Sequence, residues 1–125
     1  MNLAMTPRTP AFLLVLALSA ACATERPVKS EPVPDWLAGL IQQLEHPRAT
    51  NPPAFIARYD YHGQVVYYVA PRCCDIPSTL YDAVGTVLCA PDGGLTGAGD
   101  GRCPDFIAQK SNEKILWRPR TSLPS

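Results

Sequence analysis

The stretch that decides the fold is residues 54–70, which read AFIARYDYHGQVVYYVA. Aromatic and β-branched residues recur at every second position on both sides of His62-Gly63, the pattern of strands whose alternate side chains face a core. Gly63 supplies the positive φ that a tight hairpin requires. We therefore expect two antiparallel strands joined at His62-Gly63.

Working outward, the segment before the hairpin predicts a helix. Asp35 is a good N-cap, and Pro47 ends the helix near His46. Between them apolar residues recur at intervals of three and four, as on an amphipathic helix: Trp36, Leu37, Leu40, Ile41 and Leu44. Further short strands are expected at residues 80–81, 86–89 and 114–117. The predicted class is α+β, with one short N-terminal amphipathic helix packed on a small antiparallel sheet stapled by disulfides.

The N-terminal 21 residues predict a signal peptide. Residues 11–21 form an apolar run interrupted only by Ser19. As a helix this run spans about 16 Å, against about 30 Å of bilayer hydrocarbon. The run is therefore too short to cross a membrane and has the length of a signal-peptide core. A buried core helix is the weaker alternative, because no polar face accompanies the run.

The run ends in Leu18-Ser19-Ala20-Ala21-Cys22, which resembles the lipobox of bacterial lipoproteins. The resemblance implies a lipid on Cys22, which becomes the N-terminus. It is imperfect, because Ser19 stands where Leu is preferred, and ordinary cleavage after Ala21 or Ala23 is the rival. We expect lipid attachment and a flexible, proline-rich tether over residues 22–34, one domain over 35–119 and a tail over 120–125.

The chain has five cysteines, and lipidation of Cys22 leaves an even number in an exported protein. Four lie in the folded region: Cys73, Cys74, Cys89 and Cys103. A bond between adjacent cysteines strains the peptide, so two pairings are expected: 73–89 with 74–103, or 73–103 with 74–89. The spacing fits neither a four-cysteine zinc site nor a redox-active C-x-x-C.

A segment rich in glycine and aspartate, residues 90–106, admits three interpretations. Asp92, Asp100 and Asp105 are weak candidates for calcium ligands, because hard cations prefer carboxylate and carbonyl oxygens. A phosphate-binding loop lacks its lysine and its following helix. The favoured interpretation is a pair of tight turns, with glycines at positive φ and aspartates capping the backbone. We predict no metal and no cofactor.

Charge and catalytic signals are sparse. Removing residues 1–21 deletes one basic residue, Arg8, and leaves 10 Lys and Arg against 11 Asp and Glu, which gives no basic footprint for nucleic acid. Neither His46 nor His62 has an evident nucleophile partner, and the serines lack an elbow motif. An enzyme using carboxylates such as Asp75 or Asp82 is the alternative to a non-enzymatic protein.

Several short blocks in order resemble a known family. It is an uncharacterised domain family, of unknown function, among small exported bacterial lipoproteins. The resemblance covers about residues 36–118, and the blocks that carry it include Cys73-Cys74-Asp75, Leu80-Tyr81-Asp82, Cys89-Ala90-Pro91-Asp92-Gly93-Gly94, Gly99-Asp100-Gly101 and Cys103-Pro104-Asp105-Phe106. It implies location and architecture but no activity.

Together these observations predict a lipoprotein of the bacterial cell envelope, anchored to a membrane through Cys22 and facing the periplasm or the exterior. We expect a non-catalytic binding or interaction module whose partner is an envelope protein or a glycan. The alternatives are a small envelope enzyme and a secreted inhibitor-like domain.

Overall fold

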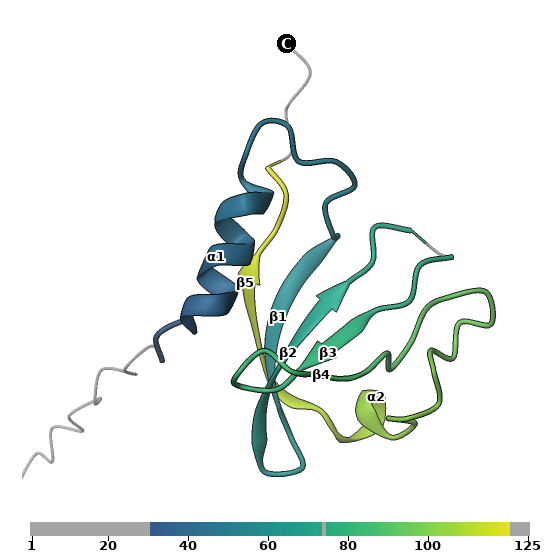
Figure 1. The fold of residues 1–125 in the computed structure, drawn as a ribbon. Coiled ribbons are helices and arrows are strands. Elements are labelled where there is room, and N and C mark those ends of the chain that lie inside the picture. The colour runs from purple at the N-terminus through teal and green to yellow at the C-terminus, as the bar shows by residue number, and fades with distance from the viewer. Residues whose placement is uncertain (1–30, 74, 121–125) are drawn as a thin grey trace, which may run out of the picture. The chain divides into compact units, whose positions relative to one another are not determined.

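The computed structural model describes residues 31–73 and 75–120, which form a small α+β domain (Figure 1). Its elements in chain order are α1 (Asp35–Leu44), β1 (Phe55–Tyr61), β2 (Gln64–Ala70), β3 (Thr79–Tyr81), β4 (Val87–Cys89), α2 (Phe106–Gln109) and β5 (Ser111–Trp117). The five strands form one antiparallel sheet in the order β4-β3-β2-β1-β5.

The predicted hairpin is confirmed. β1 and β2 pair in continuous register from Phe55↔Ala70 to Tyr61↔Gln64. His62 and Gly63 form the turn at φ 48° and 73°, the positive values that favoured hairpin turns need and that match the twist of the strands. The three further predicted strands also form, and β5 begins three residues before the predicted Lys114.

Helix α1 covers one face of the sheet. Its Leu37 is fully buried, and it packs with Ile56 of β1, Tyr67 of β2 and Trp117 of β5. The indole N–H of Trp36 donates to the carbonyl of Ala83 at 3.1 Å, which ties the helix to the β3–β4 turn.

The predicted N-cap is wrong by one residue. Pro34 occupies that position, and its carbonyl accepts the N–H groups of Leu37 and Ala38. Asp35 is instead the first helical residue, where its carboxylate stabilises the positive end of the helix dipole.

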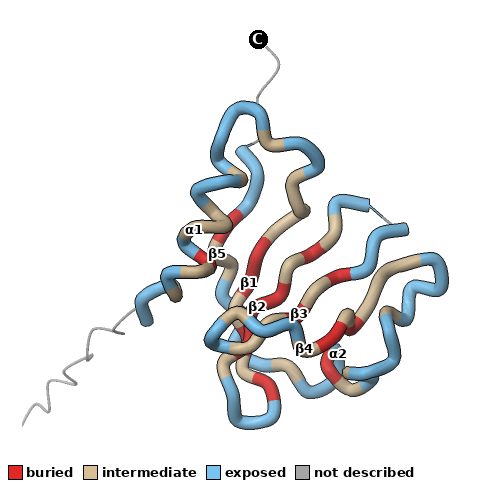
Figure 2. Tube along the Cα trace, viewed as in Figure 1, coloured by how far each residue is buried: buried red, intermediate tan, exposed pale blue. Residues whose placement is uncertain are grey.

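The opposite face is covered by the glycine- and aspartate-rich segment and by α2. The sequence pattern did not predict α2. Phe106 of α2 is fully buried against Tyr59, Tyr61 and Tyr68. Figure 2 shows buried positions along the central strands and in α2. The sheet is therefore the middle layer of three, with α1 on one side and the segment after β4 on the other.

The disulfide joins Cys89 to Cys103, with their Cα atoms 6.1 Å apart. This bond rules out both predicted pairings, each of which joined Cys89 and Cys103 to the adjacent cysteines. The reason is topological: Cys89 is 1 % exposed against the sheet, and the chain returns over that face to Cys103, whereas Cys73 lies in an exposed loop after β2. A second disulfide stays a prediction, because Cys74 lies outside the described residues.

The signal peptide, Cys22 and the tether up to residue 30 also lie outside the described residues. The described end of the predicted tether contacts the domain, because the Glu31 carboxylate lies 2.8 Å from the Arg58 guanidinium. In the part of the chain that the structure describes, no helix is long and apolar enough to cross a membrane.

Candidate functional site

The three aspartates considered as calcium ligands accept hydrogen bonds from separate parts of the domain. The Tyr68 hydroxyl donates to both carboxylate oxygens of Asp92, at 2.8 and 3.0 Å. The backbone of Asp92 is held as well, because its N–H donates to the Ser78 hydroxyl, which donates to its carbonyl. Asp92 therefore joins the loop to β2 and to the start of β3.

Asp100 stabilises the loop itself. Its carboxylate accepts the N–H groups of Ala90, at 3.0 Å, and Arg102, at 2.9 Å. The N–H of Arg102 is the largest of the causes that lower the pKa of this carboxyl. Gly99 beside it has φ 67°, and a Cβ there would lie 1.9 Å from the carbonyl oxygen of Ala90. These are the capped turns that the sequence pattern favoured.

Asp105 connects α2 to the hairpin. Its carboxylate accepts the Tyr61 hydroxyl at 2.5 Å and lies 2.7 Å from His62 Nε2. The Tyr61 hydrogen bond is the main cause that lowers the pKa of Asp105. His62 stacks on the Tyr61 ring, with the ring centres 3.9 Å apart.

These contacts bear directly on the calcium hypothesis. Within residues 31–73 and 75–120, no group of three or more His, Cys, Asp or Glu side chains is placed to hold a metal ion. The carboxylates Asp75 and Asp82 are not brought together either, because they lie beyond opposite ends of β3. Asp82 accepts the N–H groups of Val84 and Thr86 and so forms the β3–β4 turn.

Three tyrosines on the covered face carry raised pKa values. Burial is the largest cause for each, followed by hydrogen bonds to carboxylates: Tyr59 to Glu113, Tyr61 to Asp105 and Tyr68 to Asp92. The pKa of Tyr61 rises to about 12. These tyrosines are neutral donors at physiological pH, and their hydroxyls are occupied by internal acceptors.

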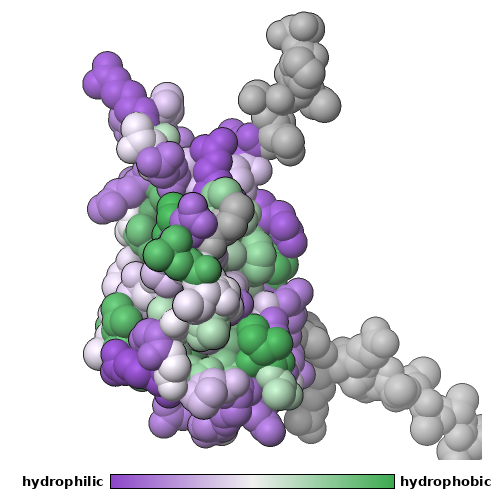
Figure 3. Space-filling model, turned by 90° about the vertical axis from the view of Figure 1, so that its right-hand side faces the viewer, coloured by the Kyte–Doolittle hydropathy of each residue, from purple (hydrophilic) through white to green (hydrophobic). Residues whose placement is uncertain are grey.

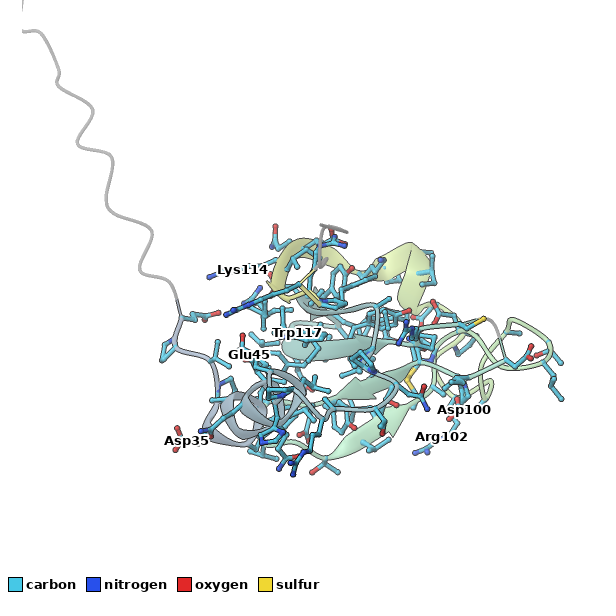
Figure 4. The ribbon with its side chains drawn as sticks, turned by 90° about the horizontal axis from the view of Figure 1, so that it is seen from above. Asp35, Glu45, Asp100, Arg102, Lys114 and Trp117 are labelled. Atoms are coloured by element: carbon cyan, nitrogen blue, oxygen red, sulfur yellow. A yellow bond between two sulfur atoms is a disulfide. The ribbon has the colours of Figure 1, made fainter. Side chains whose placement is uncertain are left out.

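The strongest candidate for a binding site is a cleft of about 280 Å³ where α1 ends near the end of β5. Its walls combine apolar side chains with charged ones: Leu44, Glu45, His46, Ala49, Pro52, Trp117, Pro119 and Arg120. The volume lies near the lower end of the range for small-molecule sites. Figure 4 shows Glu45 beside Trp117, with Asp100 and Arg102 at a distant part of the domain.

The walls of this cleft come from three segments. The helix contributes Leu44, and the loop after it contributes His46, whose Nδ1 accepts the Arg48 N–H at 3.3 Å. β5 contributes Trp117, which pairs in register with Ile56 and is 8 % exposed. Because the helix is packed on β1 and β5 through buried side chains, the cleft is held by the core.

Four exposed arginines gather at this end of the sheet: Arg48, Arg72, Arg118 and Arg120. Register places two of them there, because Phe55 pairs with Ala70, two residues before Arg72, and Ile56 pairs with Trp117, the residue before Arg118. Arg120 lines the cleft, and Arg48 lines a neighbouring hollow with His46. The Arg118 guanidinium lies 5.3 Å from the centre of the Phe55 ring. Among the described residues, Arg58 is the one arginine with an ion pair to a carboxylate.

Sequence reasoning missed this cleft. In the sequence His46 has no evident nucleophile partner, and Trp117 is predicted only as part of a strand. One signal in the sequence could have located the site. Arg48 follows the predicted helix, and Arg118 and Arg120 follow the last predicted strand, so basic residues gather just after two predicted elements. The net charge of the whole chain is zero, so the total charge gives no sign of this local excess of arginine.

Comparison with known proteins gave one family. No curated protein and no solved structure matched the chain. A family model described as a domain of unknown function, DUF6970, matches residues 42–119, close to the 36–118 over which the sequence resembled an uncharacterised family. Because this match covers more than half of the chain, the protein belongs to the DUF6970 family, a domain of unknown function.

Proposed function

We propose that this protein is an exported, lipid-anchored lipoprotein of the bacterial cell envelope that binds a partner without catalysing a reaction. The binding part of the proposal rests on the cleft between the end of α1 and the end of β5. This hollow combines an aromatic side chain, proline rings and charged side chains. Binding sites commonly have this mixture of apolar walls and a few polar groups.

The anchoring part rests on the sequence. The short apolar run, the small residues Ala20 and Ala21 and the fifth cysteine, Cys22, support lipidation. Two or three acyl chains hold a protein firmly at a bilayer, whereas one chain binds only marginally. From Cys22 to Glu31 the chain advances nine residues, which when fully extended reach about 30 Å. The domain would therefore work close to the membrane surface.

We favour binding over turnover because Asp82, Asp92 and Asp100 serve as internal hydrogen-bond acceptors. The nearest approach to catalytic chemistry is the His62–Asp105 pair. Its carboxylate also accepts the Tyr61 hydroxyl, and the pair connects the hairpin to α2. We therefore assign it a structural role and keep a small envelope enzyme as the second candidate.

Site-specific photo-crosslinking in living bacteria tests the binding function. A photoreactive amino acid replaces Thr50, which is exposed and lies between the cleft residues Ala49 and Pro52. The matched control replaces Thr96, exposed in the glycine-rich loop. We expect an ultraviolet-dependent adduct from position 50 and none from position 96. Equal adducts from both positions, or an adduct only from position 96, would contradict binding through the cleft.

A further inference from the structure

The cleft and the arginines around it carry an inference about the ligand, which rests on the proposed binding function. Arg120 in the cleft and Arg48 beside it make no ion pair with any residue of the described ranges. Of the described residues that line the cleft, Glu45 is the one acidic residue. This end of the sheet is therefore positively charged, although the described residues as a whole are not.

The charge is unevenly distributed along the strands. At the opposite end, near the hairpin turn, several carboxylates are gathered, among them Asp60, Asp105 and Glu113, with Lys110 as a nearby cation. Charges of opposite sign at the two ends give the domain an electric dipole. An approaching anion is therefore attracted to the end that carries the arginines. Guanidinium groups bind carboxylates and phosphates through paired hydrogen bonds.

The walls of the cleft indicate what carries the anionic group. Trp117, Pro52 and Pro119 offer apolar ring surfaces, while Glu45, His46 and Arg120 offer hydrogen-bonding groups. A sugar ring has the complementary surface, with C–H groups on its faces and hydroxyls around its rim. A volume of about 280 Å³ accommodates a ligand of one ring rather than an extended chain.

Figure 3, which faces the side of the domain carrying the loops after β2 and β4, shows hydrophobic residues in separate patches among polar ones. Leu95 and Ile76 are exposed apolar residues of these loops. Both lie on exposed loops, whereas the cleft lies between elements that are packed on the core, so the cleft is the better site.

We infer that the cleft binds an anionic sugar unit, whose ring packs against Pro52, Pro119 and the small exposed part of Trp117 and whose carboxylate or phosphate group contacts Arg120. Arg48, which shares a neighbouring hollow with the cleft residues His46 and Ala49, adds positive potential beside it. The ligand would be a charged saccharide accessible at the cell envelope.

Isothermal titration of the full chain, extracted from bacterial membranes in detergent, tests this inference. The probes are glucose 6-phosphate, glucuronate, neutral glucose and inorganic phosphate. We expect one or both sugar acids to bind at least about tenfold more tightly than glucose or phosphate alone, since charge-assisted hydrogen bonds are the strong ones. Whichever acid binds more tightly identifies the phosphate or the carboxylate as the natural group.

Two variants locate the site. Arg120→Gln should weaken binding of the preferred acid at least about tenfold. Arg102→Gln, an exposed arginine far from the cleft, should leave binding unchanged. Raising NaCl from about 10 to about 100 mM shortens the Debye length from about 30 to about 10 Å and should weaken binding to the unmodified protein.

Three results would overturn the inference: equal binding of glucose and the sugar acids, equal effects of the two substitutions, or no binding of any probe at millimolar concentration. Failure here is distinct from failure of the proposed function. Crosslinking at position 50 reports any partner of the cleft, and an adduct there without sugar-acid binding would retain the function and reject this ligand.

Discussion

The Tyr68 hydroxyl in the centre of the sheet donates to both oxygens of Asp92 in the loop that covers it. The Tyr61 hydroxyl donates to one oxygen of Asp105, and the Tyr59 hydroxyl donates to one oxygen of Glu113 in β5. The covering layer is therefore attached through tyrosine hydroxyls as well as through the Cys89–Cys103 bond and Phe106. A layer attached in this way should be a rigid part of the fold.

The first prediction concerns the Tyr68–Asp92 contact. Tyr68→Phe keeps the ring that packs on Phe106 but removes the donor from a half-buried carboxylate. We expect the free energy of unfolding to fall by about 1–3 kcal/mol, the cost of leaving a charged acceptor unsatisfied. Tyr81→Phe is the control, since the Tyr81 hydroxyl makes no hydrogen bond to another described residue. Urea denaturation measures both, and equal losses would contradict a specific role for this hydrogen bond.

The second prediction concerns the disulfide. Closing a loop with a sequence separation of 14 residues contributes about 3 kcal/mol in the chain-entropy model. The double variant Cys89→Ala with Cys103→Ala should therefore melt more than about 10 °C lower than the unmodified protein.

Peptide mapping checks the pairing itself. Cleavage after Arg and before Asp places Cys89 in residues 82–91, Cys103 in residues 103–104 and Cys73 with Cys74 in residues 73–74. Without reduction, the fragments 82–91 and 103–104 should remain joined. A fragment 73–74 joined to either of them would show that the assigned pairing is wrong.

Three features could be predicted from the local spacing of apolar residues. They are the hairpin, the order of secondary structure up to β4 and the helix packed on the sheet. The pairing of Cys89 with Cys103 could not, since it depends on where the chain goes after β4. Nor could the second covering layer: residues 90–105 have turn chemistry, and α2 is only four residues long. The cleft was missed because its walls come from α1, a loop and β5, which only the tertiary fold brings together.

The third prediction concerns calcium. Because the carboxylates of Asp92, Asp100 and Asp105 accept hydrogen bonds from separate donors, millimolar CaCl₂ should leave the melting temperature unchanged. A ligand at 100 times its dissociation constant would add about 2.7 kcal/mol, a rise of about 10 °C or more. Differential scanning calorimetry with and without CaCl₂ measures this. Such a rise, lost in Asp100→Asn, would restore the calcium interpretation.

The fourth prediction concerns alkaline pH. The folded-state pKa of Tyr61 is raised to about 12, whereas an unfolded tyrosine titrates near pH 10. The folded state retains its proton where the unfolded state loses it, so stability is fully present below about pH 10 and declines between about pH 10 and 12. Tyr59 and Tyr68, whose pKa values are also raised, act in the same direction.

Denaturation between pH 8 and 12 measures this decline. Tyr61→Phe should show a shallower loss of stability across the window than the unmodified protein, even though its stability at pH 8 is lower. A decline of the same steepness in both proteins would mean that the pKa of Tyr61 is not raised in the folded state.

Lipidation of Cys22 is the claim on which the envelope function depends most directly, and fatty-acid labelling measures it. The full chain and its Cys22→Ser variant are produced in a bacterial host supplied with an alkyne-bearing fatty acid, and the purified chains are tested for label. We predict label on the unmodified chain, none on Cys22→Ser, and membrane association of the first only. Label on neither chain, with both released from the membrane, would contradict the lipoprotein account.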